Sequence, residues 1–226
     1  MIGMIHGWRS AAVLVALAGV AVPAAAQVRG IPVDNSGVPR GIGIHATVGF
    51  ANDDAGGGTG YGLTGKVGFG ALGVSGMIST SDPDAGDAEI SLGGTLDYRV
   101  FGGPLVPLTV TLQAGAGWVQ AQGSDVVLPP PDVTTWHFPV GAGFTLTIPT
   151  PSLAIRPWLA PRVDVVRNST DDGDETETNF GLSGGIELNF LNGLGLHAAY
   201  DAVFADGATP GVFGVGAHYA FRTPGL

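Results

Sequence analysis

The chain lacks cysteine altogether and carries little charge. Without cysteine among its 226 residues, disulfides, thiolate metal sites and cysteine catalysis are excluded. Charged residues make up 12% of the chain, where soluble domains carry roughly 25%. The net charge of −10 is opposite in sign to that of nucleic-acid-binding proteins, so we expect no nucleic-acid partner. Past residue 30 there is neither an apolar run long enough for a membrane-spanning helix nor a helical period.

The first 26 residues have the features of a secretory signal peptide. Arg9 supplies the positive start, residues 11–22 are apolar, and Ala24-Ala25-Ala26 fits the small-residue cleavage rule. We expect cleavage before Gln27. A retained membrane anchor is the alternative, but its apolar core is short for a span. Residues 27–40 contain two prolines and two glycines, which predicts an irregular leader.

From residue 41 to 221, apolar residues alternate with small or polar ones, which is the period of β-strands. Ile42 and Ile44, for example, alternate with Gly43 and His45. Ten such segments are present, at residues 41–51, 61–71, 72–81, 88–101, 108–122, 136–148, 153–167, 179–190, 194–204 and 212–221. We therefore predict ten strands, with eight as the alternative count.

The connections between these segments alternate between short turns and longer acidic loops. The longer set comprises residues 52–60, 82–87, 123–135, 168–178 and 205–211. Thirteen of the 19 acidic residues lie in this set, which indicates that the loops share one end of the molecule. An up-and-down antiparallel meander explains the pattern, with tight turns at one end and acidic loops at the other.

Composition indicates which face of the strands points outward. The polar face consists mostly of glycine, serine and threonine, and it is too weakly charged for a typical soluble exterior. It suits the inside of a barrel whose apolar face meets lipid, and strands of about ten residues match a tilted membrane crossing. Aromatic residues of the apolar face gather near both strand ends, as the girdles of membrane barrels do. A soluble secreted β-protein is the alternative.

The last strand segment carries the most specific motif. Gly216-Ala217-His218-Tyr219-Ala220-Phe221 places Gly216, Tyr219 and Phe221 in a Gly-x-x-aromatic-x-aromatic pattern. With the alternation over residues 41–221, the chain resembles the small bacterial outer-membrane β-barrel family, the opacity-protein and OmpA/OmpX/OmpW-like group. The resemblance implies an all-β, up-and-down antiparallel transmembrane β-barrel. It also implies that Gly216, Tyr219 and Phe221 form the signal read by the outer-membrane assembly machinery.

The resemblance further implies an integral, monomeric protein of the Gram-negative cell outer membrane, with lipid and the assembly machinery as partners. The leader at 27–40 would then lie on the periplasmic side, the barrel would span residues 41–221, and residues 222–226 would form a short C-terminal extension. The acidic loops would be extracellular. No cofactor is expected.

The inward face predicts a lumen with balanced charge. The charged and histidine residues expected to line it are Lys66, Glu89, Asp97, Arg99, Arg156, Arg162, Asp164, Glu187, His197, Asp201 and His218, together with His45 and His137. Four positive and five negative groups suit a lumen closed by ion pairs. A narrow porin-like channel for small solutes is the alternative, because many inward glycines leave volume that water or a small ligand could occupy.

Two acidic loops are weak candidates for divalent cations, because calcium takes clustered carboxylate oxygens. Their residues are Asp82, Asp84 and Asp87 in one loop, and Asp171, Asp172 and Asp174 in the other. Neither loop has the twelve-residue EF-hand spacing, so a solvated acidic loop is the simpler interpretation.

Catalysis is not expected. An outer-membrane protease would need an aspartate pair facing an Asp-His pair, for which Asp53, Asp54 and His137 are the nearest match. A lipid-modifying enzyme would need a serine, a histidine and an orienting partner, and no Gly-x-Ser-x-Gly occurs. The sequence thus favours a structural or surface-interaction barrel, with a channel and then an enzyme as alternatives.

Overall fold

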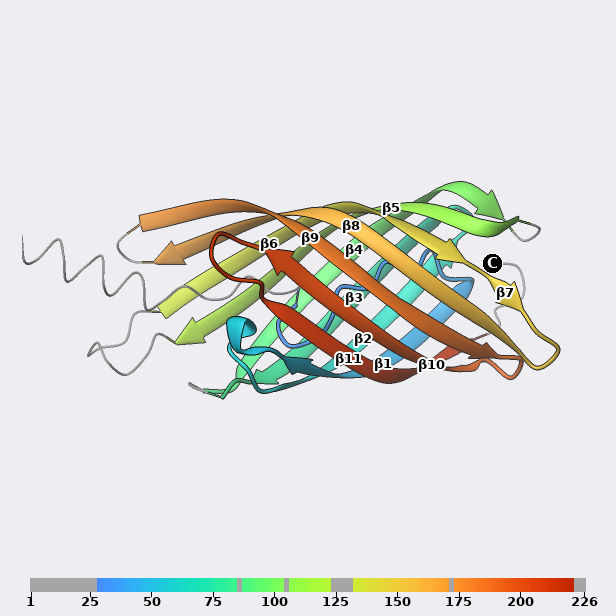
Figure 1. Ribbon diagram of the computed structural model, residues 1–226, viewed down its shortest axis with the longest axis horizontal. Coiled ribbons are helices and arrows are strands. Elements are labelled where there is room, and N and C mark those ends of the chain that lie inside the picture. Colours follow the sequence, from blue (N-terminus) through green and yellow to red (C-terminus); the bar gives the residue numbers. More distant parts are fainter. Residues whose placement is uncertain (1–27, 85–86, 104–105, 123–131, 171–172, 222–226) are drawn as a thin grey trace, which may run out of the picture.

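The chain forms a closed antiparallel β-barrel (Figure 1). The computed structural model describes residues 28–84, 87–103, 106–122, 132–170 and 173–221. The expected signal peptide at 1–26 and the C-terminal extension at 222–226 therefore lie outside the described residues. Within the described ranges, no helix is both long and apolar enough to span a membrane.

Ten long strands and one short one make up the sheet. They are β1 (Gly41–Ala51), β2 (Thr59–Phe69), β3 (Leu72–Asp82), β4 (Glu89–Gly103), β5 (Val106–Gln122), β6 (Asp132–Leu146), β7 (Ile148–Pro149), β8 (Leu153–Thr170), β9 (Gly173–Phe190), β10 (Leu194–Phe204) and β11 (Gly211–Phe221). A 3-10 turn, η1 (Asp53–Ala55), follows β1 and is capped by the Asn52 side chain. The predicted count of ten membrane-length strands is confirmed, because β7 is a two-residue extension.

Each long strand pairs with its neighbours in the chain, which is the predicted meander. The sheet closes at one further ladder, where β1 pairs with β11, and β6 pairs directly with β8 past the short β7. The first and last long strands therefore meet along a seam, in which Ile42 lies opposite Phe221 and Phe50 lies opposite Phe213. A closed barrel leaves no strand edge unpaired.

Strand alternation places the apolar residues outside and the small polar residues inside. In β3, Val74 and Ile78 are about half exposed, whereas Ser75 and Ser79, which follow them directly, are buried. Most exposed aromatic residues lie toward the two ends of the strands, as predicted, whereas Tyr200 lies in the middle of β10. Toward the loops these are Phe50, Tyr61, Trp136, Phe138, Phe180, Phe204 and Phe213, and toward the turns they are Phe69, Tyr98, Phe101, Phe144, Phe190, Tyr219 and Phe221.

Two local features differ from the predicted pattern. The loop expected at 168–178 is largely sheet, because β8 continues to Thr170 and β9 begins at Gly173. In β4, register shifts between Arg99 and Gly103 leave both Val100 and Phe101 exposed. A bulge of this kind breaks strict alternation, so two consecutive apolar residues share the outer face.

Candidate functional site

The interior of the barrel holds the polar residues that strand alternation turns inward. Eight of the predicted lumen residues are buried, namely Lys66, Asp97, His137, Arg162, Asp164, Glu187, Asp201 and His218. His45, Glu89, Arg99, Arg156 and His197 are half-buried. Of these, Arg99 lies at the turn end, where its guanidinium donates to the Gly70 carbonyl at 2.9 Å.

Residues 28–40 run through this interior without forming strand or helix. At the loop end, Arg29 forms an ion pair with Glu89, the first residue of β4. At the turn end, the Pro39 carbonyl lies so close to Gly68 that an added Cβ would be 1.9 Å away. The sequence led us to expect an irregular leader on the periplasmic side. The structure shows an irregular segment that lies inside the barrel and spans its length.

The middle of this segment is tied to one wall through Asp34. Lys66 Nζ on β2 lies 2.5 Å from Asp34 Oδ2, and the Ser36 backbone N–H donates to Asp34 Oδ1 at 2.9 Å. Gln113 on β5 donates both to the Asp34 carbonyl, at 3.0 Å, and to Asp97 Oδ1, at 2.8 Å. The side chain of Lys66 is 10% exposed and that of Asp34 is 31% exposed. The pair is therefore partly shielded from water, which strengthens its attraction.

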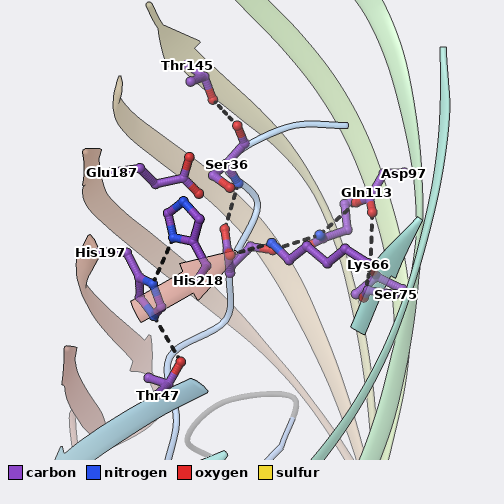
Figure 2. A network of polar contacts seen from close by, with 12 residues as sticks. Ser36, Thr47, Lys66, Ser75, Asp97, Gln113, Thr145, Glu187, His197 and His218 are labelled. Carbon is purple, nitrogen blue, oxygen red and sulfur yellow. Dashed lines mark hydrogen bonds and ion pairs between the residues drawn. The ribbon is translucent and has the colours of Figure 1, made fainter. Parts of the chain in front are cut away.

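Strands β6 and β8 hold the segment through the Ser36 carbonyl. That oxygen accepts from Thr145 Oγ1 on β6 at 2.9 Å and from Arg156 Nη2 on β8 at 2.7 Å. Arg156 also pairs with Glu187 on β9, with 2.7 Å between Nη1 and Oε2. Figure 2 shows the pale blue segment passing between Lys66 and Gln113 on one side and Thr145 and Glu187 on the other. The segment therefore links β2 and β5 to β6 and β8, and β2 lies across the barrel from β8.

Inward glycines make room for the segment. A Cβ added to Gly49 would lie 2.0 Å from the Gly30 carbonyl oxygen, and one added to Gly143 would lie 2.4 Å from the Asn35 carbonyl oxygen. An added Cβ would also lie 2.6 Å or less from an atom of the segment at Gly60, Gly62, Gly68, Gly93 and Gly214. The expectation that this volume holds water or a small ligand is thus largely wrong. The chain's own residues fill it and leave a cavity of about 40 Å³, enough for a few waters.

A second cluster is centred on Arg162. Its Nε lies 2.8 Å from Asp164 Oδ2, and its two terminal nitrogens lie 2.5 and 3.1 Å from the Asp201 carboxylate. Ser183 Oγ accepts from Arg162 and donates to Asp201, both at 2.5 Å. All three charged side chains are at most 3% exposed. Buried charges persist where they are paired in this way, so the cluster fits the predicted closed lumen.

Three histidines meet on the inward face near the seam. His45 on β1 lies opposite His218 on β11, and His197 on β10 lies diagonally across from His218. Their ring centroids are 4.7 to 5.7 Å apart. Among the described residues, this trio is the one group of at least three histidine, aspartate or glutamate side chains that lie close enough together to share one metal ion.

The predicted acidic cation sites do not form such a group among the described residues. Asp82, Asp84 and Asp87 are exposed, and no shared cluster joins them. Asp171 and Asp172 lie outside the described residues. Asp174 is engaged by Arg167 and Ser169, each 2.5 Å away, and hydrogen bonds from these two side chains hold the pKa of the Asp174 carboxyl below its usual range.

The residues considered for catalysis lie in different environments. His137 is buried inside the barrel, whereas Asp53 and Asp54 are exposed in η1. Asp54 accepts a hydrogen bond from the Thr209 backbone N–H at 2.9 Å.

The C-terminal motif divides between the two faces of β11. Tyr219 and Phe221 are exposed on the outer face, with ring centroids 4.8 Å apart in an edge-on arrangement. Gly216 faces inward, where an added Cβ would lie 2.5 Å from His197 Nε2. The glycine therefore leaves space for an imidazole ring on the neighbouring strand.

Sequence reasoning missed Arg29, Asp34, Ser36 and Gln113 as lumen residues. The first three lie in a leader without periodicity, so no pattern assigned them to a face. One local signal was present, because Asp34 two residues before Ser36 can form an Asx turn. Gln113 was on the inward face but uncharged, and its role emerges only from its contacts with the segment.

Comparison with known proteins shows likeness at the level of fold. No protein-family model matches the chain, and no curated protein is similar to it. The β-domain of the Bordetella autotransporter BrkA is 14% identical, with 80% of this chain and 98% of that chain covered and a TM-score of 0.48. The translocator domain of the autotransporter NalP from Neisseria meningitidis is 14% identical, with coverages of 94% and 98% and a TM-score of 0.44. Ail, the attachment invasion locus protein of Yersinia pestis, is 16% identical, with coverages of 80% and 100% and a TM-score of 0.37.

Proposed function

We propose that this chain is an integral β-barrel of the bacterial outer membrane, exported by a cleaved signal peptide. The outer face supports this proposal, since Leu63, Ile78 and Val140 are each about half exposed in mid-strand positions. Soluble monomers rarely leave so continuous an apolar surface in contact with water. Bands of aromatic residues at both strand ends are typical of barrels that span a membrane.

We further propose a structural or surface-interaction role with a closed lumen. The observation that carries this proposal is the path of residues 28–40, which fill the interior and bind both walls through Lys66 and Arg156. A narrow channel, the alternative, requires a continuous aqueous path that this segment now occupies. The exposed acidic loops would then be the surface available to cationic partners or to divalent ions that bridge to lipid headgroups.

Membrane insertion is tested by purifying the mature chain in detergent and comparing unheated with boiled samples on a denaturing gel. We expect a β-type circular dichroism spectrum and a shift in migration on boiling, because the folded barrel resists detergent. A protein that is soluble without detergent and migrates as a single band would contradict the proposal.

The closed lumen is tested by recordings in planar lipid bilayers. We expect no conductance steps from the wild-type chain and clear steps from a variant that lacks residues 28–40 but keeps residues 1–27. A synthetic peptide of residues 28–40, added to the open variant, should block the current, and a scrambled peptide is the control. Steady conductance from the wild-type chain would instead favour the channel.

A further inference from the structure

The three inward histidines come from strands at the closing seam of the barrel. His45 lies on the first long strand, and His197 and His218 lie on the last two. One ring nitrogen of each can be chosen so that all three lie within 4.8 Å of one another. In Figure 2, the rings of His197 and His218 face each other beside Glu187.

Hydrogen bonds orient two of the rings so that the same nitrogen of each points to a common centre. His218 Nε2 lies 2.9 Å from Asn189 Oδ1, an oxygen that can only accept. The Nε2 atom therefore carries the proton, and Nδ1 is left with a free lone pair. His197 Nε2 lies 3.0 Å from the Thr47 hydroxyl, which leaves its Nδ1 turned toward that of His218, at 3.4 Å.

This separation is the one that a tetrahedral metal centre requires. Zn–N bonds of 2.0–2.1 Å place two ligand nitrogens about 3.4 Å apart. A histidine that binds a metal through one ring nitrogen usually donates its other ring N–H to an oxygen, which fixes the orientation of the ring. Asn189 and Thr47 occupy these supporting positions, so two of three ligands are already placed. A rotation of the His45 side chain would bring in the third.

The surroundings accept a cation. The neighbouring ion pairs, Lys66 with Asp34 and Arg156 with Glu187, are each neutral as pairs. His45 and His197 also line the cavity of about 40 Å³ beside the segment. That volume has room for a water molecule as a fourth ligand.

We propose that His45, His197 and His218 bind one divalent transition-metal ion of the zinc type inside the barrel. Imidazole nitrogens suit zinc, copper and nickel, whereas calcium and magnesium prefer oxygen ligands. Because the ligands come from β1, β10 and β11, the ion links the first long strand to the last two. It therefore stabilises the closed barrel at the seam.

The first test uses the full mature chain, purified without a histidine tag, stripped with a chelator and supplied with Zn²⁺ alone. We expect one retained zinc per chain. X-ray absorption should show three nitrogen ligands at about 2.0–2.1 Å with the multiple-scattering pattern of imidazole. No retained zinc, or a shell of oxygen ligands from the acidic loops, would overturn the proposal.

Variants identify the ligands. His197→Ala and His218→Ala should each weaken zinc binding at least about 100-fold, since loss of a mere supporting group weakens it 10- to 100-fold. His137→Ala is the matched control, because it removes another buried inward imidazole outside the trio. Affinity that is unchanged in His197→Ala, or lost equally in His137→Ala, would contradict the assignment.

A variant that keeps all three histidines tests the site without removing a ligand, so that weaker binding is less easily confused with misfolding. Asn189→Ala removes the acceptor beside His218 Nε2 and should weaken zinc binding about 10- to 100-fold, with three imidazoles still coordinated. Heat-modifiable migration checks that each variant has folded. Unchanged zinc affinity in folded Asn189→Ala would show that this residue does not orient His218 for a metal.

Discussion

At the scale of single residues, the lumen is organised by charges that have partners. Arg162 is bound to both Asp164 and Asp201, and all three side chains are almost completely buried. Arg167 and Asp174 also form an arginine–aspartate ion pair, but on the exposed extension of β8 and β9. These two pairs allow the effect of burial to be separated from the effect of charge.

We predict that Arg162→Met destabilises the folded barrel by about 3–5 kcal/mol, because two buried carboxylates lose their partner. Arg167→Met is the control, and no measurable change is expected there because water solvates the released carboxylate. The free energy of unfolding is measured by urea titration in lipid vesicles. Equal effects of the two substitutions would contradict the assignment of Arg162 to a dry interior.

At the scale of elements, inward glycines and the internal segment fit one another. Gly49 on β1 lies against the Gly30 carbonyl, whereas Gly65 of β2 is exposed on the outer face and a Cβ there would meet nothing within 4 Å. The same substitution therefore has different consequences on the two strands. The absence of a side chain at Gly49 is needed because the backbone of the segment passes there.

We predict that Gly49→Ala displaces the internal segment and exposes Arg29 to trypsin, because the added Cβ would lie 2.0 Å from the Gly30 oxygen. Gly65→Ala should leave cleavage at the wild-type rate. Cleavage is followed by mass spectrometry on folded protein in detergent. Resistance of Gly49→Ala equal to that of Gly65→Ala would show that the segment does not depend on this contact.

At the scale of the whole molecule, the barrel has an apolar outside and a polar inside, the reverse of a soluble protein. Leu63 lies in the middle of β2 and is 51% exposed, while Leu191, in the turn between β9 and β10, is 62% exposed. In water the two would be similar surface leucines. In a bilayer they lie at different depths.

We predict that Leu63→Arg destabilises the inserted barrel by about 2–4 kcal/mol, whereas Leu191→Arg changes its stability by about 0–1 kcal/mol. The difference arises because a charge near the bilayer midplane loses its hydration and one near the interface keeps it. Unfolding from lipid vesicles measures both values. Similar small effects at the two positions would indicate that the apolar face does not meet lipid.

The sequence by itself determined the strand number, the meander and the face of nearly every side chain. These are local properties, because a period of two assigns alternate residues to opposite faces wherever the strand lies. It also placed Lys66, Arg162, Glu187 and His218 on the inward face, which is where the structure has them.

Only the tertiary structure decided what the inward residues meet. The leader at 28–40 has no periodicity, so its place inside the barrel follows from contacts with strands far away in the sequence, such as those of Asp34 with Lys66 and Gln113. The meeting of His45 with His218 likewise depends on the register in which the first and last strands close. Register and closure are properties of the whole barrel, and no local pattern encodes them.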